Sequence, residues 1–179
     1  IPAALFMAVS NTLLRSVALA SEDSAQCMTE VNNLLSRASV NSMFVTVIYG
    51  ILNHKTGEID FTNAGHTPAY ILQSDGQVKE VKQYANFVAG GIEDFPYRAN
   101  STRLEPGEAI VLYTDGVTEA FNAAKEEFGE ERLVSSLREL CYADVAKVIS
   151  GVHDDLHDFI QDTEQSDDIT MLVIKRKKI

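Results

Sequence analysis

The stretch from Ala109 to Ala120 combines residue types that can do chemistry. An apolar, β-prone run ends in a polar turn, and Asp115 stands where the strand is predicted to stop. A carboxylate at the end of a buried strand needs a partner, because an ionised group is costly to remove from water. A divalent metal ion is one such partner, since Mg²⁺ and Mn²⁺ prefer carboxylate oxygen. The simpler alternative is a type I turn in which Asp115 hydrogen-bonds its own backbone and Gly116 permits the tight bend.

A second acidic pair, Asp167 and Asp168, comes directly before another apolar and β-prone run, residues 169–174. If that run lies antiparallel to the strand before Asp115, the three carboxylates meet at one end of a sheet. Like charges placed that close repel each other unless a cation lies between them. The pattern therefore predicts part of a metal site formed by Asp115, Asp167 and Asp168. The alternative is an Asx turn that leads into an edge strand.

Composition limits the classes of protein to consider. The chain has 179 residues, 45% of them hydrophobic, which suits one domain with a sizeable core. Its net charge of −11 argues against a nucleic-acid partner and against an anionic membrane surface. Cys27 and Cys141 give neither a disulfide framework nor a metal-ligand spacing, so we expect free thiols in a reducing, cytoplasmic setting. No apolar run reaches the roughly 18 residues of a membrane span.

Hydrophobic periodicity predicts the elements that must position the aspartates. Helical spacing predicts helices over residues 2–19, from the capping segment 21–24 to about 38, over 130–140, and over 145–160. Apolar and β-branched runs predict strands at 44–52, 58–64, 69–72, 78–81, 98–104, 109–114 and 169–174. Residues 82–97 are predicted to be irregular. Strands grouped between two helix pairs indicate an α+β layered fold.

Seven short segments, in order along nearly the whole chain, resemble one family. They are Ile1–Met7, Met43–Thr46, Asn63–His66, Leu104–Glu108, Tyr113–Ala120, Phe128–Gly129 and Asp167–Thr170. The chain resembles bacterial metal-dependent serine/threonine phosphatases of the protein phosphatase 2C-like class, in the sporulation and stress-response (SpoIIE/RsbU) branch. The resemblance implies an α-β-β-α sandwich of two mostly antiparallel sheets flanked by helix pairs. It also assigns Asp115 and Asp167 as ligands of two Mn²⁺ or Mg²⁺ ions, with Asp168 close enough to bind outer-shell waters.

The family also carries metal-binding aspartates upstream of the Ile-Pro-Ala-Ala helix, and these have no counterpart in this sequence. The chain starts with Ile1 and not with Met, so we expect the C-terminal portion, residues 1–179, of a single phosphatase-like domain that lacks its N-terminal strands. On that expectation the fragment alone is inactive, because its dinuclear site is incomplete. The absent strands leave room for exposed sheet edges or for a domain-exchanged homodimer.

The resemblance implies a function and partners as well. It implies a protein phosphatase in which metal-activated water attacks the phosphoryl group of a phosphoserine or phosphothreonine protein. The expected substrate is a bacterial regulator of the anti-anti-sigma type, and an upstream sensor or receiver domain would control the activity, with this domain in the cytoplasm. The alternative is a degenerate phosphatase fold that regulates a signalling partner by binding alone.

Three histidines are weaker candidates. His66 follows Asn63-Ala64-Gly65 at a predicted strand end, and the choice there is between a catalytic or ligand role and a structural one. His153 and His157 lie four residues apart on a predicted helix, which would place both on one face as in zinc motifs. No third zinc ligand stands at a useful spacing, so a solvated helix face is the preferred interpretation.

Overall fold

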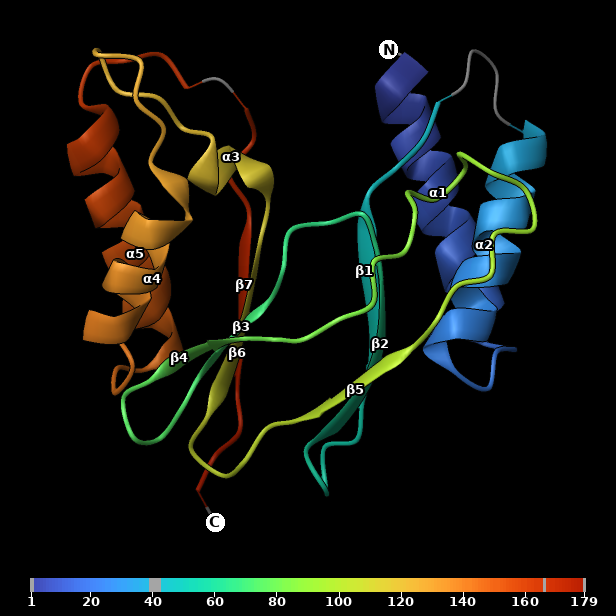
Figure 1. Cartoon of the computed structure of the whole chain (residues 1–179), viewed down its shortest axis with the longest axis horizontal. Coiled ribbons are helices and arrows are strands. Elements are labelled where there is room, and N and C mark those ends of the chain that lie inside the picture. The colour runs from blue at the N-terminus through green and yellow to red at the C-terminus, as the bar shows by residue number, and fades with distance from the viewer. Residues whose placement is uncertain (1, 39–42, 166, 179) are drawn as a thin grey trace. The chain divides into compact units, whose positions relative to one another are not determined.

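The computed structural model describes residues 2–38, 43–165 and 167–178, which contain seven strands and five helices. They divide into two compact units, residues 1–66 with 82–103 and residues 67–81 with 104–179 (Figure 1). Each unit holds one antiparallel sheet and its own helices. The predicted α+β fold with two antiparallel sheets and flanking helices is therefore confirmed. The grouping of residues 1–179 into one phosphatase-like domain stays a prediction.

The first unit packs two helices on a three-stranded sheet. Its elements are α1 (Pro2–Ala18), α2 (Ser24–Ala38), β1 (Val47–Leu52), β2 (Glu58–Ala64) and β5 (Asn100–Arg103). The strands are antiparallel in the order β1-β2-β5. The helices pack against each other, and α2 also packs against β1 and β2 (Figure 1). This face of the sheet is thereby removed from water.

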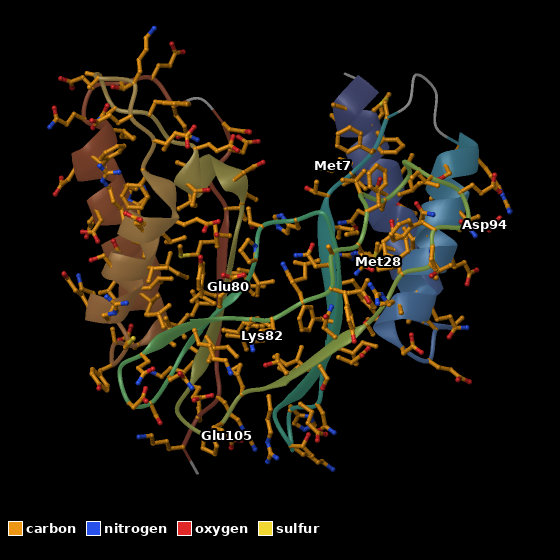
Figure 2. The ribbon with its side chains drawn as sticks, in the orientation of Figure 1. Met7, Met28, Glu80, Lys82, Asp94 and Glu105 are labelled. Carbon is orange, nitrogen blue, oxygen red and sulfur yellow. The ribbon has the colours of Figure 1, made fainter. Side chains whose placement is uncertain are left out.

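The core of the first unit lies beneath α2. Met28, labelled in Figure 2, is fully buried there, whereas Met7 on α1 is largely exposed. A buried amide, Asn32, lies in the same core. Its Nδ2 donates to the carbonyl of Ile92 at 2.8 Å, and its Oδ1 accepts from the Gly90 backbone N–H at 2.9 Å. The segment predicted to be irregular, residues 82–97, contains none of the seven strands and is held in part by these side-chain hydrogen bonds.

The first strand begins later than the sequence predicts. The β-prone run starts at Phe44, but β1 begins at Val47. Val45 exchanges two backbone hydrogen bonds of 2.9 Å with Ala89 in an isolated bridge. Pairing with the irregular segment therefore takes the residues before β1 out of the β1–β2 ladder, which local propensity alone does not reveal.

The second unit packs two helices on a four-stranded sheet. Its strands are β3 (Tyr70–Leu72), β4 (Val78–Glu80), β6 (Ala109–Tyr113) and β7 (Met171–Lys175). They are antiparallel in the order β4-β3-β6-β7. The helices are α4 (Gly129–Glu139) and α5 (Val145–Ile160), and Figure 1 shows both on one face of this sheet. These bounds match the predicted helices to within about a residue.

A single hydrophobic core joins this sheet to its helices. Val111 in the middle of β6 is fully buried, and so are Leu133 and Leu137 on α4. Val173 of β7 is paired with Val111 and lies in the same core. Since a strand presents alternate side chains to opposite faces, this pairing fixes which residues of β6 and β7 meet the helices.

Both cysteines are free, as the sequence predicts, and the structure shows that both are buried. Burial raises the pKa of the Cys27 thiol and of the Cys141 thiol, so both stay protonated at neutral pH. Neither is therefore suited to act as a thiolate nucleophile or metal ligand. In the part of the chain that the structure describes, no helix is both long enough and apolar enough to cross a membrane.

Substitution of a core residue in the second unit tests the packing directly. We expect Leu137→Ala to lower the free energy of unfolding by about 2–5 kcal/mol, because it leaves a cavity beneath α4. The matched control is Leu19→Ala, since Leu19 is 91% exposed, and we expect a change within about 0.5 kcal/mol. Urea denaturation of both variants measures the two values. Equal stability of the two variants would contradict the assigned core.

Candidate functional site

The acidic residues singled out in the sequence come together at one end of the second unit. Strand β6 pairs antiparallel with β7, with Tyr113 opposite Met171. Asp115 follows β6 by two residues, and Asp167 and Asp168 precede β7 by three or four. In Figure 1 the start of β7 and the end of β6 lie at the same end of the sheet. The sequence predicted that these two strands are antiparallel neighbours and that both acidic segments therefore lie at one end of the sheet. The pairing of β6 with β7 confirms this prediction.

Asp115 begins a single helical turn, α3 (Asp115–Thr118). Its Oδ1 accepts a hydrogen bond from the Gly116 N–H at 3.1 Å, and its carbonyl accepts from the Glu119 N–H at 2.8 Å. The simpler interpretation of the sequence was a turn in which Asp115 hydrogen-bonds the local backbone. The bond from the Gly116 N–H is a contact of this kind. The side chain is exposed, whereas the argument from the sequence assumed a carboxylate withdrawn from water. Within the described residues, no hydrogen bond engages Oδ2 of Asp115.

Thr114 joins the two acidic segments. Its Oγ1 donates to the carbonyl of Asp168 at 3.0 Å and accepts from the Thr170 N–H at 3.0 Å. Its backbone N–H donates to the Thr170 carbonyl at 3.0 Å. One hydroxyl therefore fixes the chain directly after Asp167 to the residue directly before Asp115. We refer to these three hydrogen bonds as the Thr114 clasp.

Gly116 allows this close approach. A Cβ atom at position 116 would lie 2.5 Å from the carbonyl oxygen of Asp168 and 3.0 Å from its carbonyl carbon. Those atoms belong to the backbone and cannot swing aside as the end of a side chain could. The constraint at Gly116 is therefore the space that the Asp168 backbone occupies, in addition to the tight bend considered from the sequence.

The Asp167-Asp168 segment is held by its own short hydrogen bonds. The Asp168 N–H donates to Asp167 Oδ1 at 2.7 Å, and Gln165 Nε2 donates to the Asp167 carbonyl at 2.7 Å. Both aspartate side chains are exposed. The bond to Oδ1 comes from the next residue, whereas an Asx turn has its bond two residues on, so the Asx turn of the alternative interpretation stays a prediction. Exposure leaves the carboxylates hydrated, so water screens their mutual repulsion.

The donor set agrees in kind with a hard divalent cation, since it offers only carboxylate oxygens on a fixed backbone. The number of donor side chains is too small to hold such an ion. Across residues 2–38, 43–165 and 167–178, no group of three or more His, Cys, Asp or Glu side chains is placed to hold a metal ion. Asp115, Asp167 and Asp168 thus share one end of the sheet without forming such a group by themselves. Their role as ligands stays a prediction.

A buried tyrosine pair lies next to this turn. The rings of Tyr70 and Tyr113 stack with centroids 6.0 Å apart. Burial raises the pKa of both phenols, most strongly that of Tyr113. Thr67 donates its hydroxyl proton to the Tyr113 carbonyl and so ties the end of β6 to the segment before β3. The phenols therefore stay neutral and serve packing, which places no tyrosinate base beside Asp115.

The Asn63–His66 segment belongs to the first unit, and there the asparagine makes the informative contacts. The His66 N–H donates to Asn63 Oδ1 at 2.7 Å, and Asn63 Nδ2 donates to the His66 carbonyl at 2.9 Å. Nδ2 also donates to Gln83 Oε1 at 2.9 Å. The segment is thus a turn closed by an amide that also reaches the irregular segment. The sequence drew attention to His66 and not to Asn63, the last residue but one of β2, although asparagine is a common turn residue. A structural role for His66 stays the preferred interpretation.

His153 and His157 are both exposed on α5. His157 Nδ1 lies 4.0 Å from Asp158 Oδ1, and both side chains are largely in solvent. Among the described residues, no third donor lies beside them to complete a metal-binding group. This arrangement agrees with the preferred interpretation of a solvated helix face.

Comparisons with known proteins place this geometry in context. A family model described as stage II sporulation protein E (SpoIIE) matches residues 1–177. The chain is 33% identical over 135 residues to Protein IcfG of Synechocystis sp., a match that covers 75% of this chain and 21% of that protein. It is 28% identical over 180 residues to phosphoserine phosphatase RsbU of Bacillus subtilis, covering 99% of this chain and 52% of RsbU. The chain thus spans about half, or less, of the length of these relatives.

Solved structures share the fold. The SiaA-PP2C domain of Pseudomonas aeruginosa matches with a TM-score of 0.82 and 23% identity, covering 98% of this chain and 70% of that chain. The catalytic domain of the serine/threonine phosphatase PstP, in complex with two manganese ions, matches with a TM-score of 0.64 and 12% identity. That match covers 92% of this chain and 79% of the PstP chain. At these identities the likeness establishes the fold.

The Thr114 clasp makes a testable contribution to the site. We expect Thr114→Val to lower the free energy of unfolding by about 1–2 kcal/mol, because it removes both hydrogen bonds of the hydroxyl at nearly constant volume. Thr114→Ser keeps the hydroxyl and is the matched control, expected to stay within about 0.5 kcal/mol of the wild type. Urea denaturation measures both. A valine variant as stable as the serine variant would show that the clasp contributes nothing.

Proposed function

Because the chain belongs to the stage II sporulation protein E family, whose members carry a PP2C-type phosphatase domain, we propose that it is part of a Mn²⁺- or Mg²⁺-dependent protein serine/threonine phosphatase. One observation carries the proposal. The β6–β7 pairing and the Thr114 clasp bring Asp115 and the Asp167-Asp168 pair to one end of a rigid sheet. Carboxylates fixed by backbone geometry are what a phosphoryl-transfer site with divalent ions requires of a protein.

Each residue has a distinct role in this proposal. Asp115 and Asp167 supply oxygen ligands, and Asp168 hydrogen-bonds waters of the outer shell. Thr114 holds the two acidic segments in register, and Gly116 leaves the space that their approach needs. Bound Mn²⁺ or Mg²⁺ would activate a water for attack on the phosphoryl group and neutralise phosphate charge. The two manganese ions of the PstP structure support this choice of metal.

The metal site needs more donors than this segment brings together. Two clustered aspartates leave a divalent ion largely hydrated, and such an ion is bound weakly. We propose that further carboxylates come from residues upstream in the whole protein. On this proposal, residues 1–179 alone turn substrate over poorly, and the extended chain forms the complete dinuclear site.

The proposed substrate is a phosphoserine or phosphothreonine protein, a bacterial regulator of the anti-anti-sigma type. The support is the resemblance to the sporulation and stress-response branch, together with the similarity to RsbU, a phosphoserine phosphatase. An upstream sensor or receiver domain would control the activity. The buried free thiols Cys27 and Cys141 agree with a cytoplasmic setting for the domain.

A binding module without catalysis is the second candidate. The observation in its favour is that the described residues contain no group of three metal-binding side chains. In that case the same fold would regulate a signalling partner by contact alone. The two candidates differ in whether Asp115 matters for turnover.

Substitution of Asp115 separates the two candidates. In the full-length protein with Mn²⁺, we expect Asp115→Asn to reduce hydrolysis of p-nitrophenyl phosphate by on the order of a hundredfold or more, since it removes a charged metal ligand. The exposed side chain packs little, so the melting temperature should stay nearly unchanged. Asp154→Asn on the outer face of α5 is the matched control and should keep full activity. Near-normal turnover of Asp115→Asn in saturating Mn²⁺, or equal wild-type activity in excess chelator, would refute the metal-dependent mechanism.

Calorimetric titration with Mn²⁺ tests whether the metal ligands are divided between residues 1–179 and the residues upstream. We expect residues 1–179 to bind Mn²⁺ at least about tenfold more weakly than a chain extended upstream, because the extension would add ligands and a second ion site. Turnover of p-nitrophenyl phosphate should rise with the extension as well. Equal affinity and equal turnover of the two chains would show that the upstream residues contribute nothing to the site.

A further inference from the structure

The second unit has a basic pocket at the end of the sheet away from the aspartates. Its volume is about 810 Å³, and four consecutive basic residues, 175–178, line it together with the turn between α4 and α5. Figure 1 shows the C-terminal end of β7 at the edge opposite α3. Lys177 comes nine positions after Asp168, or up to about 30 Å along an extended chain. The pocket is therefore distinct from the candidate metal site.

Two of the four basic side chains are built into the pocket wall. Lys175 is half-buried, and its Nζ donates to the Ala143 carbonyl at 2.7 Å. Arg176 donates from Nη1 to the Leu104 carbonyl at 2.7 Å, while its backbone pairs with the turn before β6. The Lys175 bond holds positive charge at the wall, because its acceptor is a neutral carbonyl and does not cancel that charge.

The other two basic side chains face solvent. Lys177 and Lys178 are exposed. The stem of Lys178 lies across the turn at Gly107, where a Cβ would come within 2.5 Å of Lys178 Cε. Among the described residues, no carboxylate forms an ion pair with either lysine. Asp144 is the acidic residue of the pocket lining, and its Oδ1 is engaged by the Lys147 N–H at 2.8 Å.

The floor of the pocket is apolar. Ala143, Val145 and Ala146 line it beside the basic residues, and Tyr142 stands at its edge with 73% of its surface exposed. An exposed tyrosine beside an apolar hollow and a basic rim is typical of a protein-binding surface. Inorganic phosphate would fill little of a hollow this size. A nucleic acid would meet a chain whose net charge is −11.

We propose that this basic pocket docks an acidic segment of a partner protein, with acidic side chains on Lys177 and Lys178 and an apolar side chain against Tyr142 and the floor. Complementary charge selects this occupant, because the pocket is a local positive region on a strongly acidic protein. The proposal is independent of the phosphatase assignment, since it uses none of the candidate metal ligands.

Fluorescence polarisation with the full chain tests the proposal. The probe is a labelled peptide of about a dozen residues, rich in Glu and with a central Leu-Phe pair, compared with a counterpart in which Gln replaces every Glu. We expect the acidic peptide to bind and the Gln peptide to bind at least about fivefold more weakly. Binding should weaken as salt is raised. Equal binding of both peptides, or no binding of the acidic one, would overturn the proposal.

Variants locate the binding surface. The double variant Lys177→Ser/Lys178→Ser should weaken acidic-peptide binding about fivefold, and Tyr142→Ala should weaken it by a similar factor. The matched control is Lys79→Ser/Lys82→Ser, which removes the same charge from exposed lysines outside the pocket and should change binding less than about twofold. Equal loss in the control pair would mean general charge attraction and would refute the pocket.

Two further measurements close the test. A duplex oligonucleotide that binds more tightly than the acidic peptide and depends on Lys177 and Lys178 would overturn the protein-docking assignment. Hydrolysis of p-nitrophenyl phosphate by the full-length protein should be unchanged in the Lys177→Ser/Lys178→Ser variant. A failure of the docking proposal is thereby distinguishable from a failure of the metal-site proposal, which depends on Asp115.

Discussion

The antiparallel pairing of β6 with β7 is the constraint on which the second unit depends. Five residue pairs fix its register, from Ala109 with Lys175 to Tyr113 with Met171. The buried pair Val111 and Val173 lies at the centre and faces the helices. A slip of one residue would turn that face of β7 away from the core, so packing energy strongly disfavours any other register. The same register decides which loop residues meet beyond each end of the two strands.

The two ends of this strand pair have opposite chemistry. At one end the acidic turn after β6 meets the Asp167-Asp168 segment, and the Thr114 clasp joins them. At the other end residues 175–178 place basic side chains around a pocket. One strand, β7, thus runs from a region suited to cations toward a region suited to anions. Since exposed charges are screened beyond about 10 Å at moderate salt, the two regions can act independently.

The sequence was sufficient where local pattern decides the outcome. Periodicity identified the four longer helices and the antiparallel strands, and α5 has the predicted bounds. The sequence also identified Asp115 and Asp167 as residues that an antiparallel sheet would bring to one end. The sequence was insufficient where the structure depends on a contact between distant segments. Val45 leaves the β1 ladder to pair with Ala89, and Thr114 bonds to a residue more than fifty positions away. Neither contact leaves a local pattern that periodicity could detect.

Exposure of the aspartates changes the physical argument for the metal site. The sequence suggested a carboxylate withdrawn from water that would need a cation as its partner. In the structure Asp115, Asp167 and Asp168 are exposed, so water can stabilise their charges without an ion. Metal affinity must then come from the number and placement of ligands and not from relief of a buried charge.

This leaves preorganisation as the contribution of the fold. The Thr114 clasp and the space left by Gly116 place two acidic segments of backbone side by side before any ligand arrives. A site prepared in this way loses little entropy when an ion binds. Each added carboxylate then contributes nearly all of its interaction with the ion to the binding free energy. Under the proposed function, the two aspartates would be a scaffold to which further ligands are added. That property suits a phosphatase whose metal site is completed by other parts of the protein.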